Sequence, residues 1–319
     1  MGRKIFITGA TGFVGRYLID LLKEKEPDCL VSGTCFPEHP ESCDVLDGLD
    51  LSHVDIRSED DVSECIKRVQ PDWIFHLAAI SNVGYSWTNR KETLEANLMG
   101  TFYLFEAVRK HSPRSRVLFV SSSDVYGILV PTAEALSEDL DPRVINPYAF
   151  TKVCGEQMSR FYSEIEGLDI VIARAFPHTG PGQSPDFVCS DWASQIAKIE
   201  KGLMEPVLRV GSLEVMRDFS DVRDVVKAYV SLLEKGKRGE IYNVCSGRAE
   251  VLKDILDMLI SFSSKKIKVK VDPNRKRKAD IPLLLGNNEK IRKELNWMPE
   301  IPLNQTLKDL LDYWREKVT

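Results

Sequence analysis

A glycine-rich turn directly after the first apolar run constrains the fold of this chain more than any other feature of its sequence. The turn, TGATGFVG, spans 8–15 and lies between the apolar run Lys4 to Ile7 and an amphipathic stretch from Phe13 to Lys25. Three glycines at this spacing between a strand and a helix are typical of a βαβ unit that binds a dinucleotide at the helix N-terminus. The sequence therefore predicts a nucleotide-binding α/β fold, with the nucleotide phosphates against this turn.

The alternation of apolar runs and amphipathic stretches continues through the first half of the chain. The predicted strands are Lys4 to Ile7, Leu30 to Cys35, a short run at Val54, Trp73 to Leu77, Arg116 to Val120 and Asp169 to Ala173. The predicted helices are 13–25, 60–69, 93–110 and 148–164. Near-continuous hydrophobic strands separated by helices indicate a doubly wound parallel sheet that is covered on both faces.

The character of the sequence changes after Ala175, where glycine and proline become frequent between Pro177 and Pro185. We therefore expect a dinucleotide-binding Rossmann domain over 1–175, rejoined by about 216–240, and a smaller α/β substrate-binding domain over 176–319. In the second domain, lysines alternate with Ile267, Val269 and Val271. That pattern, within the basic cluster 265–278, predicts an edge strand with a solvated face, and the alternative is a role of the cluster in holding an anionic ligand.

Composition and charge exclude several classes of protein. Of the 319 residues, 43% are apolar and 29% are charged, a balance that is typical of folded globular chains. The 43 basic and 48 acidic residues give a net charge of −5, so the chain lacks the basic field of a nucleic-acid-binding protein. No apolar run reaches the roughly 18 residues of a membrane span. The seven cysteines form no CxxC pair, so we expect reduced thiols, no metal site and a cytoplasmic location.

The glycine turn and the end of the second strand carry the first predicted contacts to a cofactor. Gly9 allows the tight turn, Gly12 lets the backbone approach a pyrophosphate, and Gly15 lets helix and strand pack closely. After the second strand, a carboxylate favours NAD and a basic residue favours NADP. The candidates here are Glu38 and His39, and they leave open whether the cofactor is NADH or NADPH.

Asp55, which follows the third predicted strand, has two interpretations. Its carboxylate would accept a hydrogen bond from the adenine amino group of the cofactor, or it would form the turn or cap before the next helix. Both interpretations stay open at the level of sequence.

Two side chains on the helix after residue 147 form a candidate catalytic pair. Tyr148 and Lys152 are four residues apart and therefore lie on one helix face. A tyrosine titrates near ~10, so it needs positive charge close by to exchange a proton near neutrality, and Lys152 supplies that charge. The serine run 121–123 follows the preceding strand, at the sheet edge where parallel α/β folds bind ligands. Together these features predict hydride transfer to a carbonyl, with the tyrosine as proton donor or acceptor.

These motifs resemble the extended short-chain dehydrogenase/reductases of the NAD-dependent epimerase/dehydratase family, which act on nucleotide sugars. The shared motifs are the TGxxGxxG turn at 8–15 and the YxxxK pair at 148–152. Segments 174–183 and 210–219 are similar to the GDP-sugar branch of that family, and most similar to its GDP-4-keto-6-deoxy-D-mannose reductases. The resemblance covers essentially the whole chain.

The resemblance implies a role for each residue that matches a family motif. Ser122, Tyr148 and Lys152 are the expected catalytic residues, and Asn97 matches the structural asparagine. With the residues named above, the expected contacts to NADPH or NADH are Gly9, Thr11, Gly12, Phe13, Val14, Gly15, Asp55, Ile56, Leu77, Ala78, Ala79, Tyr148 and Lys152. The expected substrate contacts are Ser81, Val83, Ser86, Ser123, His178, Arg217, Arg277 and Asp280.

Two arginines of these sets, and the histidines His76 and His178, have a physical interpretation of their own. Arg217 and Arg277 are expected to hold a diphosphate, because guanidinium groups bind phosphate oxygens in a bidentate manner. The alternative for both is an ordinary surface or ion-paired arginine. The histidines lack metal-ligand spacing. We therefore expect His76 to be a packed strand residue and His178 to be a pocket residue.

The implied reaction is reduction of the 4-keto group of a GDP-6-deoxy-4-keto-hexose, from GDP-4-keto-6-deoxy-D-mannose to GDP-D-rhamnose. GDP-mannose 4,6-dehydratases use as base a glutamate two residues after the catalytic serine or threonine, and that position here is Asp124, a further candidate catalytic residue. Its side chain is one methylene shorter, and displacing a base by about 1 Å costs on the order of a hundredfold in rate. A dehydratase or another nucleotide-sugar 4-epimerase stays the enzymatic alternative. A cofactor-binding regulator without turnover is the alternative of another class.

The resemblance also implies a homodimer, because the family dimerises through two helices, here near 93–110 and 148–164. Leu98, Phe102 and Phe105 follow helical spacing in the first of them. They fit either that interface or a core against the sheet.

Overall fold

The computed structural model describes residues 2–36, 49–127, 134–275 and 281–318. Its centre is a seven-stranded sheet with the strand order β11-β6-β5-β4-β1-β2-β3. The strands are β1 (Lys4–Thr8), β2 (Leu30–Cys35), β3 (Asp50–His53), β4 (Trp73–His76), β5 (Arg116–Ser122), β6 (Asp169–Ala175) and β11 (Ile241–Val244). Every neighbouring pair runs parallel, which confirms the predicted doubly wound parallel sheet. The third strand, expected at Val54, ends one residue before it.

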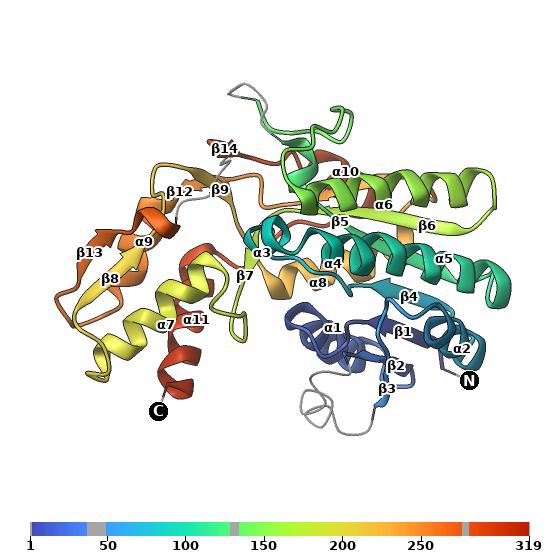
Figure 1. Cartoon of the computed structure of the whole chain (residues 1–319), viewed down its shortest axis with the longest axis horizontal. Coiled ribbons are helices and arrows are strands. Elements are labelled where there is room, and N and C mark those ends of the chain that lie inside the picture. The colour runs from blue at the N-terminus through green and yellow to red at the C-terminus, as the bar shows by residue number, and fades with distance from the viewer. Residues whose placement is uncertain (1, 37–48, 128–133, 276–280, 319) are drawn as a thin grey trace.

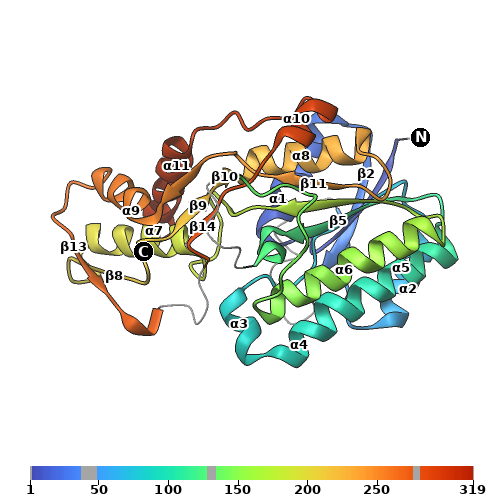
Figure 2. The ribbon, with the colours of Figure 1, turned by 90° about the horizontal axis from the view of Figure 1, so that it is seen from above.

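Helices cover both faces of this sheet, as Figures 1 and 2 show. One face carries α1 (Phe13–Lys25), α8 (Val222–Lys235) and α10 (Glu289–Leu295), and the other carries α2 (Glu59–Val69), α5 (Gly100–His111) and α6 (Pro147–Glu164). Successive buried side chains of β1 point to opposite faces of the sheet. Ile5 and Ile7 pack toward α1 and α8, whereas Phe6 packs toward α2 and α5. Two separate hydrophobic cores therefore hold the three layers together, because successive side chains of a strand point to opposite faces.

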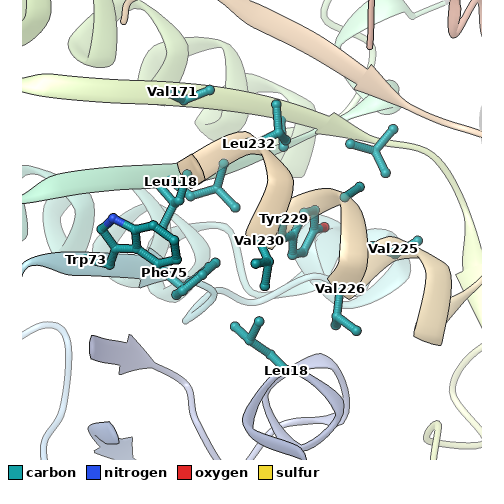
Figure 3. Close-up of a cluster of buried hydrophobic side chains, with 14 of the residues drawn as sticks. Leu18, Trp73, Phe75, Leu118, Val171, Val225, Val226, Tyr229, Val230 and Leu232 are labelled. Atoms are coloured by element: carbon teal, nitrogen blue, oxygen red, sulfur yellow. The ribbon is translucent and has the colours of Figure 1, made fainter. Parts of the chain in front are cut away.

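The core under α8 joins a late segment of the chain to the first half, and Figure 3 shows it in detail. The α8 side chains Val225, Val226, Tyr229, Val230 and Leu232 lie near Trp73, Phe75, Leu118 and Val171 of three strands and near Leu18 of α1. β11 follows α8 and pairs with β6 at the sheet edge. Residues 222–244 thus return to the sheet that the first half begins, while the domain boundary near residue 175 stays a prediction.

A second group of elements has its own core and lies on the left in Figure 1. We call it the distal unit: α7 (Val188–Glu200), α9 (Leu252–Ser261), α11 (Leu303–Lys317), β8 (Val207–Val210) and β13 (Lys268–Val271). β13 pairs with β8 in a two-stranded sheet, and all four of its residues are exposed. β13 is therefore an edge strand, as predicted, but Val269 and Val271 are exposed as well as the lysines, so it has no packed face.

Two small sheets connect the distal unit to the main sheet. One contains β9 (Met216–Asp218), β12 (Ala249–Val251) and β14 (Leu283–Leu284), and the other contains β7 (His178–Thr179) and β10 (Ser220–Asp221). The buried carboxylate of Asp218 is central to the first. It accepts hydrogen bonds from the backbone N–H groups of Ser246 (2.8 Å), Gly247 (2.9 Å) and Gly286 (3.2 Å). One carboxylate therefore satisfies donors from two segments that are far apart in the sequence.

The prediction of one continuous helix over 93–110 is wrong in one detail. The segment consists of α4 (Arg90–Leu94), a π-helical turn (Glu95–Met99) and α5, and it follows a short helix α3 (Val83–Thr88). Gly100, at the junction, lies so close to Ile56 that a Cβ would be 2.8 Å from its side chain. Phe105 is fully buried in the core, whereas Leu98 and Phe102 are half-buried. The sequence left two interpretations of this run, a dimer interface and a core against the sheet. The burial of Phe105 fits the core.

The described cysteines correct a second expectation. Cys29, Cys65, Cys154, Cys189 and Cys245 are free thiols, but Cys35 is disulfide-bonded, so the prediction that all cysteines are reduced is wrong there. Within the part of the chain that the structure describes, no helix combines the length and apolar character that a membrane crossing needs.

We predict that Asp218→Ala lowers the free energy of unfolding by about 3 kcal/mol, because three backbone N–H groups, one of them on the buried Gly286, lose their acceptor. Urea unfolding followed by circular dichroism measures this. Asp257→Ala is the control, because Asp257 forms only an exposed pair with Lys253, and a change within about 0.5 kcal/mol is expected there. Equal unfolding midpoints for the two variants would contradict the role given to Asp218.

Candidate active site

The glycine turn between β1 and α1 has the geometry of a phosphate cradle. Gly9 has a φ of +70°, and a Cβ there would lie 3.0 Å from the backbone nitrogen of Ala78. A Cβ on Gly15 would lie 2.4 Å from the carbonyl oxygen of Ala10. Gly12 is the N-cap of α1 and offers no side chain to the N–H groups of the first turn. These donors, at the positive end of the helix, fit the pyrophosphate of a nicotinamide dinucleotide.

A chain of hydrogen bonds ties this turn to the neighbouring strand and helix. Thr8 Oγ1 accepts from the backbone nitrogen of Ala78 (3.1 Å) and lies 2.8 Å from Nδ1 of His76. Nε2 of His76 lies 2.9 Å from Thr101 Oγ1, which donates to the carbonyl of Asn97 at 2.6 Å. Burial and the charge of a nearby lysine lower the pKa of His76 to about 3. His76 is therefore a neutral, packed strand residue, as predicted.

Asn97 holds the loop after β4 against α6. Its Oδ1 accepts from the backbone nitrogen of Ile80 at 2.7 Å, and its Nδ2 donates to the carbonyl of Ile80 (3.0 Å) and to Thr151 Oγ1 (3.1 Å). Thr151 in turn donates to the carbonyl of Tyr148 at 2.7 Å. The structural role expected of Asn97 is thus to fix this loop relative to the helix that carries the tyrosine.

Tyr148 and Lys152 lie in the first turns of α6, which Asn146 caps through its side chain. Lys152 Nζ donates to the carbonyl of Val120 at 2.8 Å and lies 5.8 Å from the centre of the Tyr148 ring. Both side chains are buried. Burial lowers the pKa of Lys152 to about 8, although the carboxylate of Glu156 acts to raise it. The ammonium group is therefore placed beside the phenol, as the sequence predicts.

Ser122 ends β5 and lines the same cavity as Tyr148. Its Oγ accepts from the backbone nitrogen of Asp124 at 3.2 Å, which leaves the hydroxyl hydrogen for another acceptor. Burial and the charge of Asp124 raise the pKa of Tyr148, while a hydrogen bond with Ser122 lowers it. The raising effects prevail. At neutral pH the tyrosine is a protonated phenol, which is the form that donates a proton.

A cavity of about 590 Å³ extends from the glycine turn past these side chains to the distal unit. The predicted site residues that line it are Gly9, Gly12, Phe13, Val14, Gly15, Leu77, Ala79, Ser81, Val83, Ser122, Ser123, Asp124, Tyr148, Lys152, His178 and Arg217. Those that do not line it are Thr11, Asp55, Ile56, Ala78 and Ser86. Arg277, Asp280, Glu38 and His39 lie outside the described residues.

Asp55 and Ser86 have partners of their own. Asp55 accepts from the backbone nitrogen of Arg57 at 2.9 Å and forms an ion pair with its guanidinium at 2.6 Å. Burial acts to raise the pKa of Asp55, but the hydrogen bonds and charge of Arg57 prevail and lower it. Asp55 thus forms the turn before α2, one of its two interpretations, and the adenine contact stays a prediction. Ser86 is fully buried and donates to the carbonyl of Val83 at 2.7 Å.

The loop after β6 and strand β9 bring two further predicted residues to the cavity. The ring of His178 stacks on Phe13 of the glycine turn, with 6.4 Å between ring centres. Burial lowers the pKa of His178, so its imidazole is neutral at pH 7. Arg217 is buried and donates to the carbonyl of Ile281 at 2.6 Å. Both side chains therefore lie where a ligand that reaches the distal unit would pass.

Sequence patterns do not predict two charged residues of this cavity, Asp191 on α7 and Arg275. Arg275 donates to the carboxylate of Asp191 at 2.5 Å, and Gln195 donates to the same oxygen at 2.9 Å. The two are 84 positions apart. Arg275 belongs to the basic cluster 265–278, but no local pattern connects it with Asp191. Among the described residues, no three histidine, cysteine or acidic side chains group as metal ligands would.

Comparison with known proteins gives one family and relatives of similar length. The family model described as GDP-mannose 4,6 dehydratase matches residues 6–310. The chain is 33% identical to a GDP-6-deoxy-D-mannose reductase of Pseudomonas aeruginosa, over 100% of this chain and 99% of that protein. It is 29% identical to a GDP-6-deoxy-D-talose 4-dehydrogenase of Aggregatibacter actinomycetemcomitans, over 90% of each. The solved structure of RMD from Pseudomonas aeruginosa complexed with NADPH is 31% identical, with a TM-score of 0.87, over 99% of this chain and 100% of that one.

We predict that Tyr148→Phe lowers the rate of NADPH oxidation with a 4-keto sugar nucleotide by about a hundredfold or more, because the proton donor is lost. Its affinity for NADPH, measured by fluorescence titration, is expected to stay within a few-fold. Tyr162→Phe is the matched control, since Tyr162 lies on the same helix and its hydroxyl binds Glu106. A Tyr148→Phe variant as active as the control would contradict the role of the phenol.

Proposed function

This chain belongs to the GDP-mannose 4,6-dehydratase family, and within that family we propose that it reduces the 4-keto group of a GDP-6-deoxy-4-keto-hexose. The proposed reaction converts GDP-4-keto-6-deoxy-D-mannose to GDP-D-rhamnose with NADPH or NADH. Full-length similarity to a protein named GDP-6-deoxy-D-mannose reductase, and structural similarity to RMD complexed with NADPH, support the proposal.

The chemistry follows from three side chains around one point of the cavity. A bound nicotinamide supplies the hydride that reduces carbon 4 of the sugar. Ser122 donates a hydrogen bond to the ketone oxygen, and Tyr148 gives its proton to that oxygen as the alkoxide forms. Lys152 places a positive charge beside the phenol and stabilises the phenolate that remains. The carbon gains the hydride and the oxygen gains the proton, so an alcohol results.

Full-length similarity to a protein named GDP-6-deoxy-D-mannose reductase carries the assignment of direction, and the neutral state of the Tyr148 phenol is compatible with it. Burial and the charge of Asp124 favour the neutral phenol, and reduction begins with that form. A dehydratase or epimerase begins by oxidising the sugar, which requires the phenolate first. The reductase assignment therefore agrees with the electrostatics of the unliganded site.

The enzymatic alternative is a GDP-mannose 4,6-dehydratase or another nucleotide-sugar 4-epimerase. The description of the matching family model and the carboxylate of Asp124, which lines the cavity, favour it. Asp124 is one methylene shorter than the glutamate base expected there, and a base that is about 1 Å out of place costs on the order of a hundredfold. The intact serine, tyrosine and lysine count against a regulator without turnover.

We assign the sugar and diphosphate to the part of the cavity beyond Tyr148. Ser81, Val83 and Ser123 line it near the catalytic side chains, and His178 and Arg217 line it toward the distal unit. A guanidinium group such as that of Arg217 suits a diphosphate. The roles predicted for Arg277 and Asp280 are part of this assignment.

We also propose that the chain forms a homodimer through α5 and α6, which pack side by side on the outer face of the sheet. Apolar side chains are exposed on this face, with Phe150, Phe161 and Ile165 on and just after α6 and Met99 just before α5. Phe161 is 50% exposed. Exposed large apolar side chains that gather on one face favour an interface.

The free thiols support a cytoplasmic location, and the disulfide-bonded Cys35 does not.

We predict that Asp124→Asn retains NADPH-dependent reduction of the 4-keto sugar nucleotide within about tenfold, because reduction needs no base at that position. The assay follows the loss of NADPH absorbance, and Asp141→Asn, on an exposed residue, is the control. Water loss from GDP-mannose, assayed in parallel, distinguishes the alternative. The dehydratase would become the favoured function if the unmodified protein removed water from GDP-mannose without reducing the keto sugar nucleotide, and if Asp124→Asn lowered the rate of that dehydration by about a hundredfold or more.

For the assembly, we expect light scattering to give the mass of two chains for the unmodified protein and of one chain for Phe161→Glu, because a charge would be buried in the interface. Met298→Glu is the control, since Met298 is exposed elsewhere on the molecule. A single-chain mass for the unmodified protein contradicts the dimer.

A further inference from the structure

Two buried charged side chains that the proposed chemistry does not use lie directly behind the catalytic residues. Glu156 on α6 and Arg174 on β6 form an ion pair whose side chains are 1% and 2% exposed. The pairing is bidentate, with Nε to Oε1 and Nη2 to Oε2 both at 2.9 Å. Buried ion pairs are costly to desolvate and are rarely needed for stability alone. This pair therefore calls for a role beyond holding the fold together.

The carboxylate of Glu156 also reaches the strand that carries the catalytic serine. Ser121 donates its hydroxyl to Glu156 Oε1 at 2.5 Å. Lys152, one turn before Glu156 on the same helix, donates to the carbonyl of Val120 at 2.8 Å. The two residues immediately before Ser122 are thus each bound by a charged side chain of α6. The end of β5 cannot shift relative to the tyrosine helix without breaking both contacts.

Arg174 extends this network to Glu138 and, through Tyr126, to the edge strand β11. It is the register partner of Ser121 across β5 and β6. Its guanidinium donates to the carbonyl of Glu138 at 3.2 Å and lies 4.8 Å from the centre of the Tyr126 ring. The hydroxyl of Tyr126 donates to Asn243 at 2.7 Å on β11. Arg174 is therefore held from three sides, and its bidentate contact fixes the orientation of the Glu156 carboxylate.

We propose that Glu156 is a positioning residue for the reductase reaction: it holds the strand end that presents Ser122, and its charge keeps the Lys152 side chain in its ammonium form. This inference rests on the proposed function and deepens it, because it names the group that maintains the positive charge beside Tyr148. Glu156 itself touches neither the ketone nor the nicotinamide in this assignment.

The charges that face Lys152 from the elements packed against it can be named. On α6 they are Tyr148, a neutral phenol, and the carboxylate of Glu156. On β4 there is His76, whose pKa is lowered to about 3 and which is neutral at working pH. On β6 there is Arg174, a cation that is paired with Glu156. Among these groups Glu156 alone favours the ammonium, in agreement with the upward effect that it has on the pKa of Lys152.

The test compares the pH dependence of kcat/KM for NADPH-driven reduction in Glu156→Gln, in the double variant Glu156→Gln with Arg174→Met, and in Glu164→Gln. The glutamine still accepts the Ser121 hydroxyl, so the first variant removes mainly the charge. The double variant removes the uncompensated arginine that destabilises the single one. Glu164 is exposed at the end of the same helix and is the matched control. Thermal unfolding and NADPH affinity are measured alongside.

We expect the alkaline loss of activity to move to lower pH by about one unit or more in Glu156→Gln, because an opposite charge at this range shifts a pKa by that amount. A smaller shift in the same direction is expected in the double variant, which also loses the positive charge of Arg174. The unfolding temperature is expected to fall in the single variant and to recover in the double variant. A profile that stays where it is in the unmodified protein, with only the unfolding temperature changed, would overturn the proposal, because Glu156 would then be merely structural.

Ser121→Ala provides an independent test, because it removes only one hydroxyl and leaves the ion pair in place. We expect kcat to fall by about tenfold with little change in KM and no shift of the pH profile. An unchanged kcat contradicts the positioning of Ser122 by this network. If the unmodified protein binds NADPH but oxidises none with a 4-keto sugar nucleotide, the proposed function fails instead, and the two failures are thereby distinguished.

Discussion

The hydrogen bond from the buried ammonium group of Lys152 to the carbonyl oxygen of Val120 is the contact on which the site depends. It joins α6 to the end of β5, and these two elements supply the phenol and the serine hydroxyl. Burial costs the ammonium so much that its pKa falls to about 8. The charge persists near neutrality because a carboxylate lies one helical turn away and the carbonyl oxygen of Val120 accepts a hydrogen bond from the ammonium group. Any change that weakens either partner acts on the proton donor as well.

A second chain of contacts fixes the same helix relative to the glycine turn. Starting at Thr8, it passes through His76 and Thr101 to Asn97. From Asn97 it continues through Thr151 to the carbonyl of Tyr148. A protonated imidazole would need an acceptor on each side, and the nearby lysine disfavours it, so the neutral form of His76 suits this position. The cradle for the cofactor and the proton donor are therefore held by side chains of packed strands and helices, and their spacing does not depend on a surface loop.

Local patterns predict much of this arrangement. The glycine turn, α1 and β2 have the expected bounds because their patterns are periodic over a whole element. Motif spacing likewise brings together Ser122, Tyr148 and Lys152, the proposed catalytic residues. Three features escape such reasoning. The π-helical turn at 95–99 arises from tertiary contacts of Asn97 and of Gly100 with Ile56. Long-range pairs such as Asp191 with Arg275 and Glu156 with Arg174 join residues that no local pattern connects. The carboxylate of Asp55 binds Arg57, two residues away, and no motif predicts that contact.

The central claim is that hydride passes from the nicotinamide to a ketone carbon held between Ser122 and Tyr148. Reduction of GDP-4-keto-6-deoxy-D-mannose with NADPH that carries deuterium at the transferred position of the ring tests it directly. The account predicts deuterium at carbon 4 of the recovered sugar nucleotide, with one label gained for each NADPH oxidised. Product without label at carbon 4, or NADPH oxidation without a labelled sugar, would contradict it.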